Sequence, residues 1–163
     1  MVISYEKMLA ALRRRPAVAR LVCLTARWLP RCFMGGYVLL CGWSLVFRRE
    51  ALLQTLAVPA VTLVICRLLR RWIARPRPCE KLDILPLIRR DGRRDSFPSN
   101  HAASAMIIAL AFCWHFPALS VLWLLTALLV AASRVLVGVH WVTDVLAGMG
   151  LGLLLGILGF WIL

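Results

Sequence analysis

Acidic residues are scarce in this sequence of 163 residues, which has seven Asp and Glu against 20 Lys and Arg and a formal net charge of +13. They form no Asp/Glu cluster suited to Mg²⁺, so we expect a protein that works without a metal or another cofactor. None of the six cysteines belongs to a CxxC pair, which argues against a zinc site and a disulfide framework. Internal repeats are also missing, and the length suits a single domain over residues 1–163.

Apolar residues are abundant instead. They make up 62% of the chain and give a mean hydropathy of +0.83, whereas soluble domains contain roughly 45–50% apolar residues. All of the basic residues except Lys7 and Lys81 are arginine, which suits bidentate contacts with phosphate. Basic proteins often bind nucleic acid, but here the arginines lie between long apolar runs. Anionic lipid headgroups are therefore the better partner, and the composition predicts a multi-pass protein of a cell membrane.

The apolar runs predict an all-α integral membrane protein with a bundle of about five transmembrane helices. The expected spans are about 32–47, 51–69, 102–115, 119–133 and 142–163. Residues 1–31 alternate apolar and basic positions, which predicts an amphipathic helix in the membrane interface, joined at Pro30 to a bundle over residues 32–163. Because successive spans alternate in direction, the polar loop at 70–101 and the junction of the last two spans share one membrane face.

Two polar clusters lie in that loop. Residues 70–78 carry four arginines, and Pro76 and Pro78 force an extended exit from the second span. In residues 96–101, Pro98 and Ser99 stand where a helix begins, and a helix N-terminus offers free backbone N–H groups to a phosphate. His101 would lie in the first turn of that helix. The two clusters together favour an anion-binding site.

A third cluster, residues 133–144, contains a histidine and a carboxylate. His140 opens the fifth span, and Asp144 follows four residues later on the same helix face. A carboxylate there can accept a hydrogen bond from one ring nitrogen and leave the lone pair of the other exposed, which makes an oriented nucleophile. Asp144 is the only acidic residue in the last three predicted spans, and intramembrane charges usually have a partner and a role. The three clusters supply what phosphoryl transfer without a metal needs.

These residues resemble the signature of the type 2 phosphatidic acid phosphatase family, whose three motifs are K-x6-R-P, P-S-G-H and S-R-x5-H-x3-D. The third motif is matched in full by Ser133, Arg134, His140 and Asp144. The second is matched by Pro98, Ser99 and His101, with Asn100 in place of glycine. The first is matched by Arg77 and Pro78, with Arg70 in place of lysine. The resemblance covers about residues 50–163.

The resemblance implies a lipid phosphatase with a covalent histidine intermediate. His140 would attack phosphorus with Asp144 orienting its ring, and His101 would protonate the leaving oxygen and then activate water. The phosphate would be bound by five residues, namely Arg70, Arg77, Ser99, Asn100 and Arg134. Outside the motifs, Arg75 is a candidate for substrate contact or for a supporting role. Arg89, Arg90, Arg93 and Arg94 are assigned to anionic lipid rather than to a second phosphate, and His115, at the opposite face, is expected to be structural.

The substrate implied by the resemblance is a polyprenyl diphosphate or a phosphoglycerolipid. The small size and the segment SFPSNHA look most like the undecaprenyl-diphosphate phosphatases. Phosphatidylglycerophosphate and phosphatidate phosphatases stay open as alternatives, and so do a lipid phosphotransferase and a non-enzymatic protein that binds anionic lipid. The positive-inside rule assigns the site to the cytoplasmic face, whereas most bacterial members of the family hold it outside. The sequence fixes neither the face nor the oligomeric state.

Overall fold

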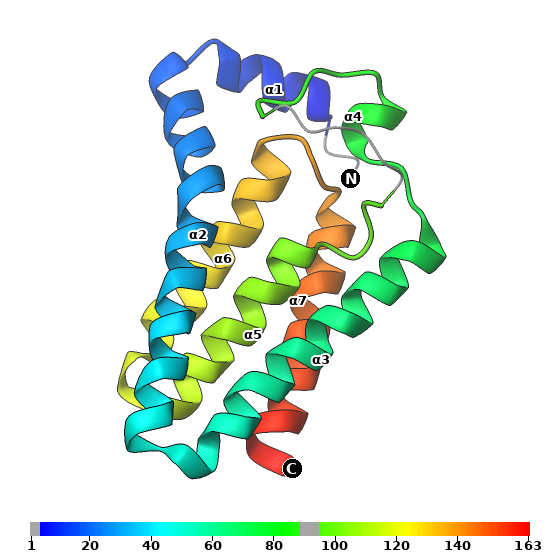
Figure 1. Cartoon of the computed structure of the whole chain (residues 1–163). Helices are drawn as coiled ribbons and strands as arrows, with labels where there is room; N and C mark the ends of the chain where they lie inside the picture. Colours follow the sequence, from blue (N-terminus) through cyan, green and yellow to red (C-terminus); the bar gives the residue numbers. More distant parts are fainter. Residues whose placement is uncertain (1–3, 89–94) are drawn as a thin grey trace.

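The computed structural model describes residues 4–88 and 95–163, which form a bundle of helices (Figure 1). In chain order the elements are α1 (Tyr5–Arg13), α2 (Pro16–Phe47), α3 (Arg49–Ile73), α4 (Pro78–Lys81), α5 (Asn100–His115), the 3₁₀ turn η1 (Pro117–Leu119), α6 (Ser120–Leu136), α7 (Val142–Ile157) and the π-helical turn η2 (Leu158–Ile162). Within the described part of the chain, four helical segments are long and apolar enough to cross a membrane: Pro16–Phe47, Arg49–Lys81, Pro117–Leu136 and Val142–Ile162.

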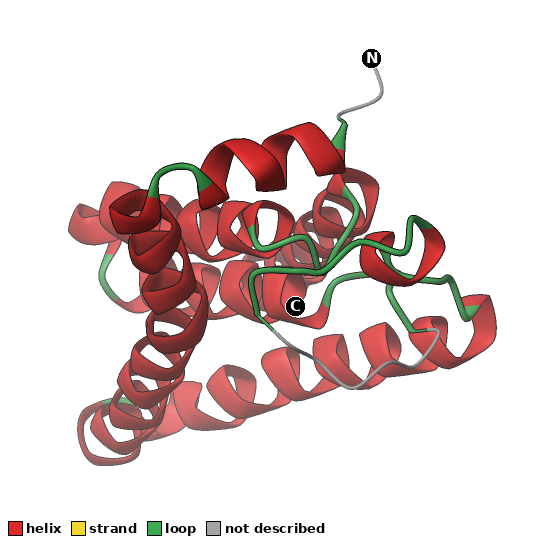
Figure 2. Ribbon diagram, turned by 90° about the horizontal axis from the view of Figure 1, so that it is seen from above, coloured by secondary structure: helices red, strands yellow, loops and turns green. Residues whose placement is uncertain are grey.

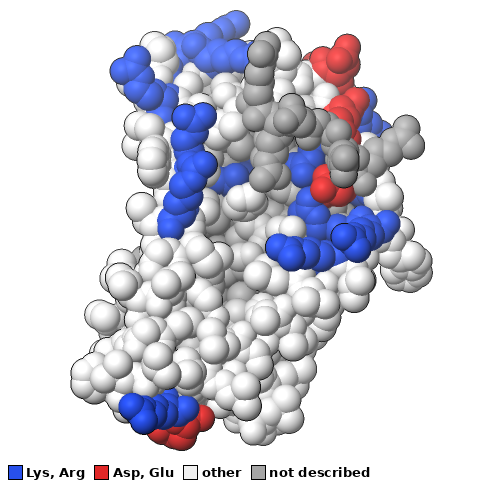
Figure 3. All heavy atoms as spheres, viewed as in Figure 1, with Lys and Arg blue, Asp and Glu red and all other residues white. Residues whose placement is uncertain are grey.

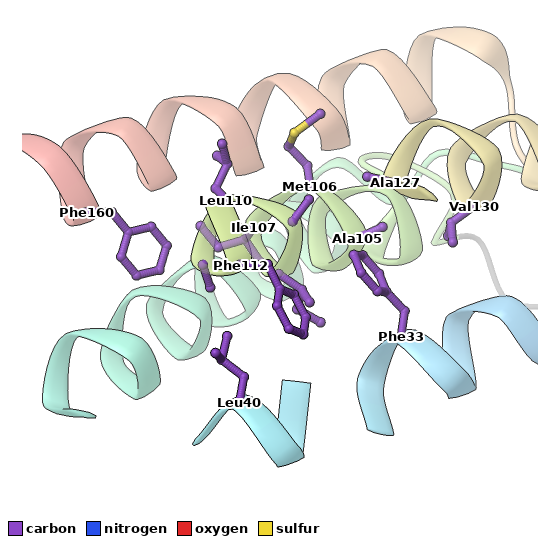
Figure 4. Packing of buried hydrophobic residues seen from close by; sticks show 13 residues of the cluster. Phe33, Leu40, Ala105, Met106, Ile107, Leu110, Phe112, Ala127, Val130 and Phe160 are labelled. Atoms are coloured by element: carbon purple, nitrogen blue, oxygen red, sulfur yellow. The ribbon is translucent and has the colours of Figure 1, made fainter. Parts of the chain in front are cut away.

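The fifth long helix, α5, lies at the centre of the bundle and packs against α2, α3, α6 and α7. Nearly every residue from Ala102 to Cys113 is buried. Phe33 and Leu40 reach α5 from α2, and Phe160 reaches it from η2 (Figure 4). With 16 residues α5 extends about 24 Å, less than the ~30 Å of a hydrocarbon core. The predicted all-α membrane bundle of about five helices with a preceding N-terminal helix is confirmed, and its neighbours enclose the short helix α5.

The boundary predicted at Pro30 is wrong, because α2 continues through this residue without a break. Proline removes one backbone donor from a helix interior. Packing on both sides compensates, since the buried residues Ala26, Phe33, Leu40 and Ser44 form a single stripe along α2. The interfacial helix is therefore only α1, and residues 16–31 belong to the first spanning helix. That residues 1–163 form one domain stays a prediction.

Helices α5 and α7 approach closely because α7 presents glycine to α5 at every fourth residue. A Cβ atom added to Gly148 would lie 2.5 Å from the Ser99 carbonyl oxygen, and one added to Gly152 would lie 2.8 Å from that of Ala103. Small residues at this spacing let membrane helices pack backbone to backbone. Gly150, on another face of α7, has nothing within 4 Å of the added Cβ. The contact at Gly148 fixes the start of α5 against α7.

The two ends of the bundle differ in charge. On the face shown in Figure 3, Lys and Arg side chains gather around α1, down the first part of α2 and at the end of α3, while the surface below them is uncharged as far as the opposite end. The opposite end carries the turn Arg48-Arg49-Glu50. His115 lies at that opposite end, where its Nε2 is 2.8 Å from the Thr55 hydroxyl and its ring packs edge-on against Trp43. This placement fits the structural role expected for His115.

Candidate active site

Four segments lie at the end of the bundle that carries α1: the last turn of α3, the stretch into α4, the stretch into α5, and the loop between α6 and α7 (Figure 2). Backbone hydrogen bonds join them. The Ser96 N–H donates to the Arg75 carbonyl (2.9 Å), and the Ser99 N–H donates to the Asp144 carbonyl (2.9 Å). The three clusters found in the sequence therefore lie at one end of the bundle, as predicted.

His140 and Asp144 are fully buried at the centre of this region, each with 0% exposure. The distance from His140 Nδ1 to Asp144 Oδ2 is 3.7 Å, which is too long for a direct hydrogen bond. Ser96 connects the two residues, because its hydroxyl donates to Asp144 Oδ2 (2.5 Å) and lies 3.4 Å from His140 Nδ1. His140 Nε2 has no hydrogen-bond partner among the described residues. Burial lowers the pKa of His140 below its usual value despite the opposing effect of the Asp144 carboxylate.

Besides Ser96, two further groups hold Asp144. Its Oδ2 accepts from the Trp141 N–H at the start of α7 (3.0 Å), and its Oδ1 pairs with Arg75 Nη1 (2.9 Å). The same Arg75 nitrogen donates to Thr143 Oγ1 (2.8 Å), and the guanidinium carbon lies 5.5 Å from the centre of the Trp141 ring. Of the two roles open to Arg75, the supporting one is the role its contacts favour, since it fixes and neutralises the carboxylate.

Arg70 and Arg77 share one acidic partner, Asp95. Arg70 Nη2 lies 3.1 Å from one carboxylate oxygen, and Arg77 Nη2 lies 3.0 Å from the other. Burial alone would raise the pKa of Asp95, but the hydrogen bonds and charges of Arg77 and Arg70 lower it. Both arginine side chains are more than nine-tenths buried, while that of Asp95 is 41% exposed. The two guanidinium groups thus converge on an anion at the edge of the site, where phosphoryl oxygens could replace the carboxylate.

The start of α5 offers further unused polar atoms. Ser99 is the N-cap residue, as predicted, but its side chain makes no capping hydrogen bond. Neither Ser99 Oγ nor Asn100 Oδ1 has a hydrogen-bond partner in the parts of the chain described. His101 follows in the first turn, and it lines a partly open cavity of about 610 Å³ together with Asn100 and Arg134. A ligand in this cavity would meet the N-terminus of α5, which favours anions.

Helix α1 covers the loop that carries His140. The Tyr5 hydroxyl donates to the His140 carbonyl (3.3 Å) and accepts from the Val142 N–H (3.1 Å), and the Tyr5 ring packs edge-on against Trp141. Leu9 packs against Gly138, whose φ of +80° needs glycine at this turn. Tyr5 is 3% exposed and Leu9 is 2% exposed. The N-terminal helix therefore contributes directly to the geometry around His140.

All eight site residues predicted from the sequence lie at this end of the bundle, whereas three contributors were missed. The sequence pointed weakly to two of them, because Ser96 belongs to the cluster at residues 96–101 and Asp95 is an isolated acidic residue directly before that cluster. Nothing in the sequence pointed to Tyr5. Arg89, Arg90, Arg93 and Arg94 lie outside the described residues. Within residues 4–88 and 95–163, no group of three or more His, Cys, Asp or Glu is arranged to hold a metal ion.

Comparison with known proteins gives consistent matches. The family model described as "PAP2 superfamily" matches residues 51–163. The chain is 35% identical over 136 residues to phosphatidylglycerophosphatase B of Bacillus subtilis, a match over 76% of this chain and 64% of that protein. It is 32% identical over 118 residues to "Putative undecaprenyl-diphosphatase YbjG" of Escherichia coli, over 72% of this chain and 59% of that protein. The chain thus spans less than two thirds of the length of either relative.

A solved structure agrees with the fold. The crystal structure of a transmembrane PAP2 type phosphatidylglycerolphosphate phosphatase from Bacillus subtilis superimposes with a TM-score of 0.72 at 30% identity. The match covers 95% of this chain and 82% of that one. Because it includes nearly the whole chain, the likeness extends beyond residues 51–163 to the N-terminal helices.

Proposed function

Since the chain belongs to the PAP2 superfamily, we propose that it hydrolyses a phosphate or diphosphate group of a membrane lipid through a phosphohistidine on His140. One observation carries the proposal. His140 is fully buried, its Nδ1 side faces Ser96 and Asp144, and its Nε2 has no hydrogen-bond partner among the described residues. A neutral imidazole with one nitrogen held in this way presents a lone pair for attack.

In the first step, the Nε2 lone pair of His140 attacks phosphorus, and the bond from phosphorus to the leaving oxygen breaks. His101 donates a proton to that oxygen. The ring of His140 becomes cationic, and the Asp144 carboxylate, joined to it through Ser96, stabilises the charge. Arg70, Arg77 and Arg134 bind the phosphoryl oxygens with Ser99, Asn100 and the N–H groups at the start of α5, so that electrostatic stabilisation lowers the barrier.

In the second step, His101, now neutral, takes a proton from water as the water oxygen attacks phosphorus. The bond from phosphorus to Nε2 breaks, which releases inorganic phosphate and restores neutral His140. No metal ion takes part in this scheme, because the arginines and the helix N-terminus supply the positive charge. Arg70 in the lysine position keeps that charge, and Asn100 in the glycine position leaves the helix start intact.

The favoured substrate is undecaprenyl diphosphate, with phosphatidylglycerophosphate and phosphatidate as alternatives. Relatives named for the first two lipids are similar to this chain at comparable levels of identity. A transferase that passes phosphate to an acceptor other than water would form the same phosphohistidine. Release of inorganic phosphate, with one oxygen from ¹⁸O-labelled water, separates hydrolysis from transfer.

The test measures phosphate release from the three lipids by the purified protein in detergent, with and without EDTA. His140→Ala should lower release by at least about 10³-fold. His115→Ala is the matched control, because it makes the same change at the opposite end of the bundle. A ³²P label from substrate should stay on unaltered protein as an acid-labile, base-stable phosphohistidine. Release that needs a divalent metal, or that persists in His140→Ala, would refute the mechanism.

A further inference from the structure

The cavity beside His101 extends away from the catalytic centre and has two kinds of wall. It lies between α2, α5 and α6, and His101 and Arg134 line it on the α5 and α6 side. Toward the middle of the bundle its wall is apolar, with Phe33, Ile108 and Val130 among its lining residues. Its volume of about 610 Å³ exceeds what a phosphate alone needs and lies within the range of roughly 300–1,000 Å³ typical of ligand sites.

The remaining wall carries positive charge from α2. Arg27 and Arg31 both line the cavity, and their spacing of four residues puts them on one face of the helix. Neither forms a salt bridge with any residue in 4–88 or 95–163. Arg31 donates to the Arg27 carbonyl (3.0 Å), and its guanidinium carbon lies 5.4 Å from the centre of the Trp28 ring. These contacts hold Arg31 against α2, and Arg27 keeps its donors for a ligand.

The position of Arg27 and Arg31 relative to His101 decides which part of a substrate these arginines can bind. Under the proposed mechanism His101 protonates the leaving oxygen, so the leaving group must extend from phosphorus toward His101. Because His101 lines the cavity, the leaving group enters it and passes Arg27 and Arg31 on the opposite wall. Its lipid tail can follow the apolar wall toward the bilayer. A basic wall at this point complements a leaving group that carries its own negative charge.

We propose that Arg27, supported by Arg31, forms a subsite for an anionic group of the leaving lipid, so that the enzyme prefers substrates whose leaving group retains a phosphate. This inference rests on the proposed function. Two substrate types share the required chemistry: a polyprenyl diphosphate, which leaves as a polyprenyl phosphate, and phosphatidylglycerophosphate, which leaves as a phosphodiester. Phosphatidate, which leaves as neutral diacylglycerol, gains nothing from the subsite. Both arginines precede residues 51–163, so the family match does not account for them.

The test compares kcat/KM on these three lipids for unaltered protein, Arg27→Gln, Arg31→Gln and the control Arg20→Gln. Arg20 is an exposed arginine on the same helix that does not line the cavity. Loss of a partly exposed charge-assisted contact should lower kcat/KM by about tenfold in Arg27→Gln on the lipids with an anionic leaving group. Hydrolysis of phosphatidate should change less than about twofold, since no such contact is lost there. The lipid that suffers the larger loss identifies the source of the anion. Equal losses on all three lipids, or none, would overturn the subsite.

A binding measurement keeps this result separate from failure of the proposed function. Unaltered protein should bind a lipid with a methylene-bridged bisphosphonate headgroup more tightly than the matching monophosphonate, and Arg27→Gln should remove that preference. Preference without hydrolysis of any lipid would preserve the subsite and refute the phosphatase. Hydrolysis without preference, with Arg27→Gln still folded, would refute the subsite alone.

Discussion

Replacing Asp144 by Asn tests the centre of the site most directly, because Asn keeps the shape of the side chain and removes its charge. Each carboxylate oxygen has its own task. Oδ1 faces Arg75, while Oδ2 accepts from Ser96 and from the Trp141 N–H on the side of His140. If the NH₂ of the Asn faces Arg75, two donor groups face each other without an acceptor between them. An Asn with its NH₂ on the other side faces the Trp141 N–H and favours a proton on His140 Nε2, which removes the nucleophilic lone pair.

Both orientations of the amide should therefore reduce catalysis. By analogy with other histidine–carboxylate pairs, we expect kcat to fall by about 10²–10⁴-fold. The loss of stability should be about 2–4 kcal/mol, since the hydrogen bonds to a buried carboxylate weaken and the partly exposed Arg75 contributes little. Ser96→Ala keeps the carboxylate and should cost only about tenfold in kcat.

The assay is single-turnover phosphate release together with thermal unfolding in detergent. Asp83→Asn serves as the control, because it makes the same change at an exposed residue outside the site. If Asp144→Asn is folded and keeps more than about a third of kcat, the carboxylate does not orient His140 and the reasoning fails.

Three further predictions follow from the geometry. Burial lowers the pKa of His140, so the neutral nucleophile persists on acidification. The apparent pKa of the acid limb in a pH profile of kcat/KM should therefore lie below the ordinary histidine value of about 6.5. An apparent pKa above that value would contradict this. Tyr5→Phe removes both hydrogen bonds between the Tyr5 hydroxyl and the backbone around His140, and it should lower the free energy of unfolding by about 1 kcal/mol. Steady-state kinetics should show a lower kcat and a nearly unchanged KM. An effect on KM alone would argue for a role in binding. Gly148→Ala places a Cβ against the Ser99 carbonyl and should destabilise the protein by about 1–3 kcal/mol. Gly150→Ala is the control and should be tolerated, since its Cβ meets nothing within 4 Å. Equal unfolding temperatures for the two variants would contradict the close contact of α5 and α7.

The helical bundle and the gathering of the candidate site residues at one end of it could be predicted, because local sequence patterns determine both. Apolar runs of helical length define the spans, and fixed spacings such as that from His140 to Asp144 place residues on one face. The continuous α2 could not be predicted, since a proline and several arginines normally end an apolar span. Only the packing of Ala26 and Phe33 on either side of Pro30 shows why the helix persists.

The contacts among the candidate site residues were less predictable than their common location. A spacing of four residues suggests a direct hydrogen bond from His140 to Asp144. The distance from His140 Nδ1 to Asp144 Oδ2 is 3.7 Å, however, and the Ser96 hydroxyl connects the two side chains instead. Ser96 precedes Asp144 by 48 residues, and Tyr5 precedes Val142 by 137. Such contacts depend on how α1 and the stretch into α5 fold back over the site, and no local pattern encodes that path.

The scarcity of acidic residues gives the arginines of this protein two different roles. Arg70 and Arg77 share the carboxylate of Asp95, and Arg75 pairs with Asp144, so two of their three positive charges are balanced before substrate arrives. Binding a phosphate to Arg70 and Arg77 must then displace the exposed Asp95, which favours a strongly anionic phosphoryl group over a weak one. Arg27 and Arg31 have no such competitor among the described residues, and a second phosphate can reach them at no comparable cost. A lipid with two adjacent negative groups therefore binds to the two sites more tightly than a lipid with one.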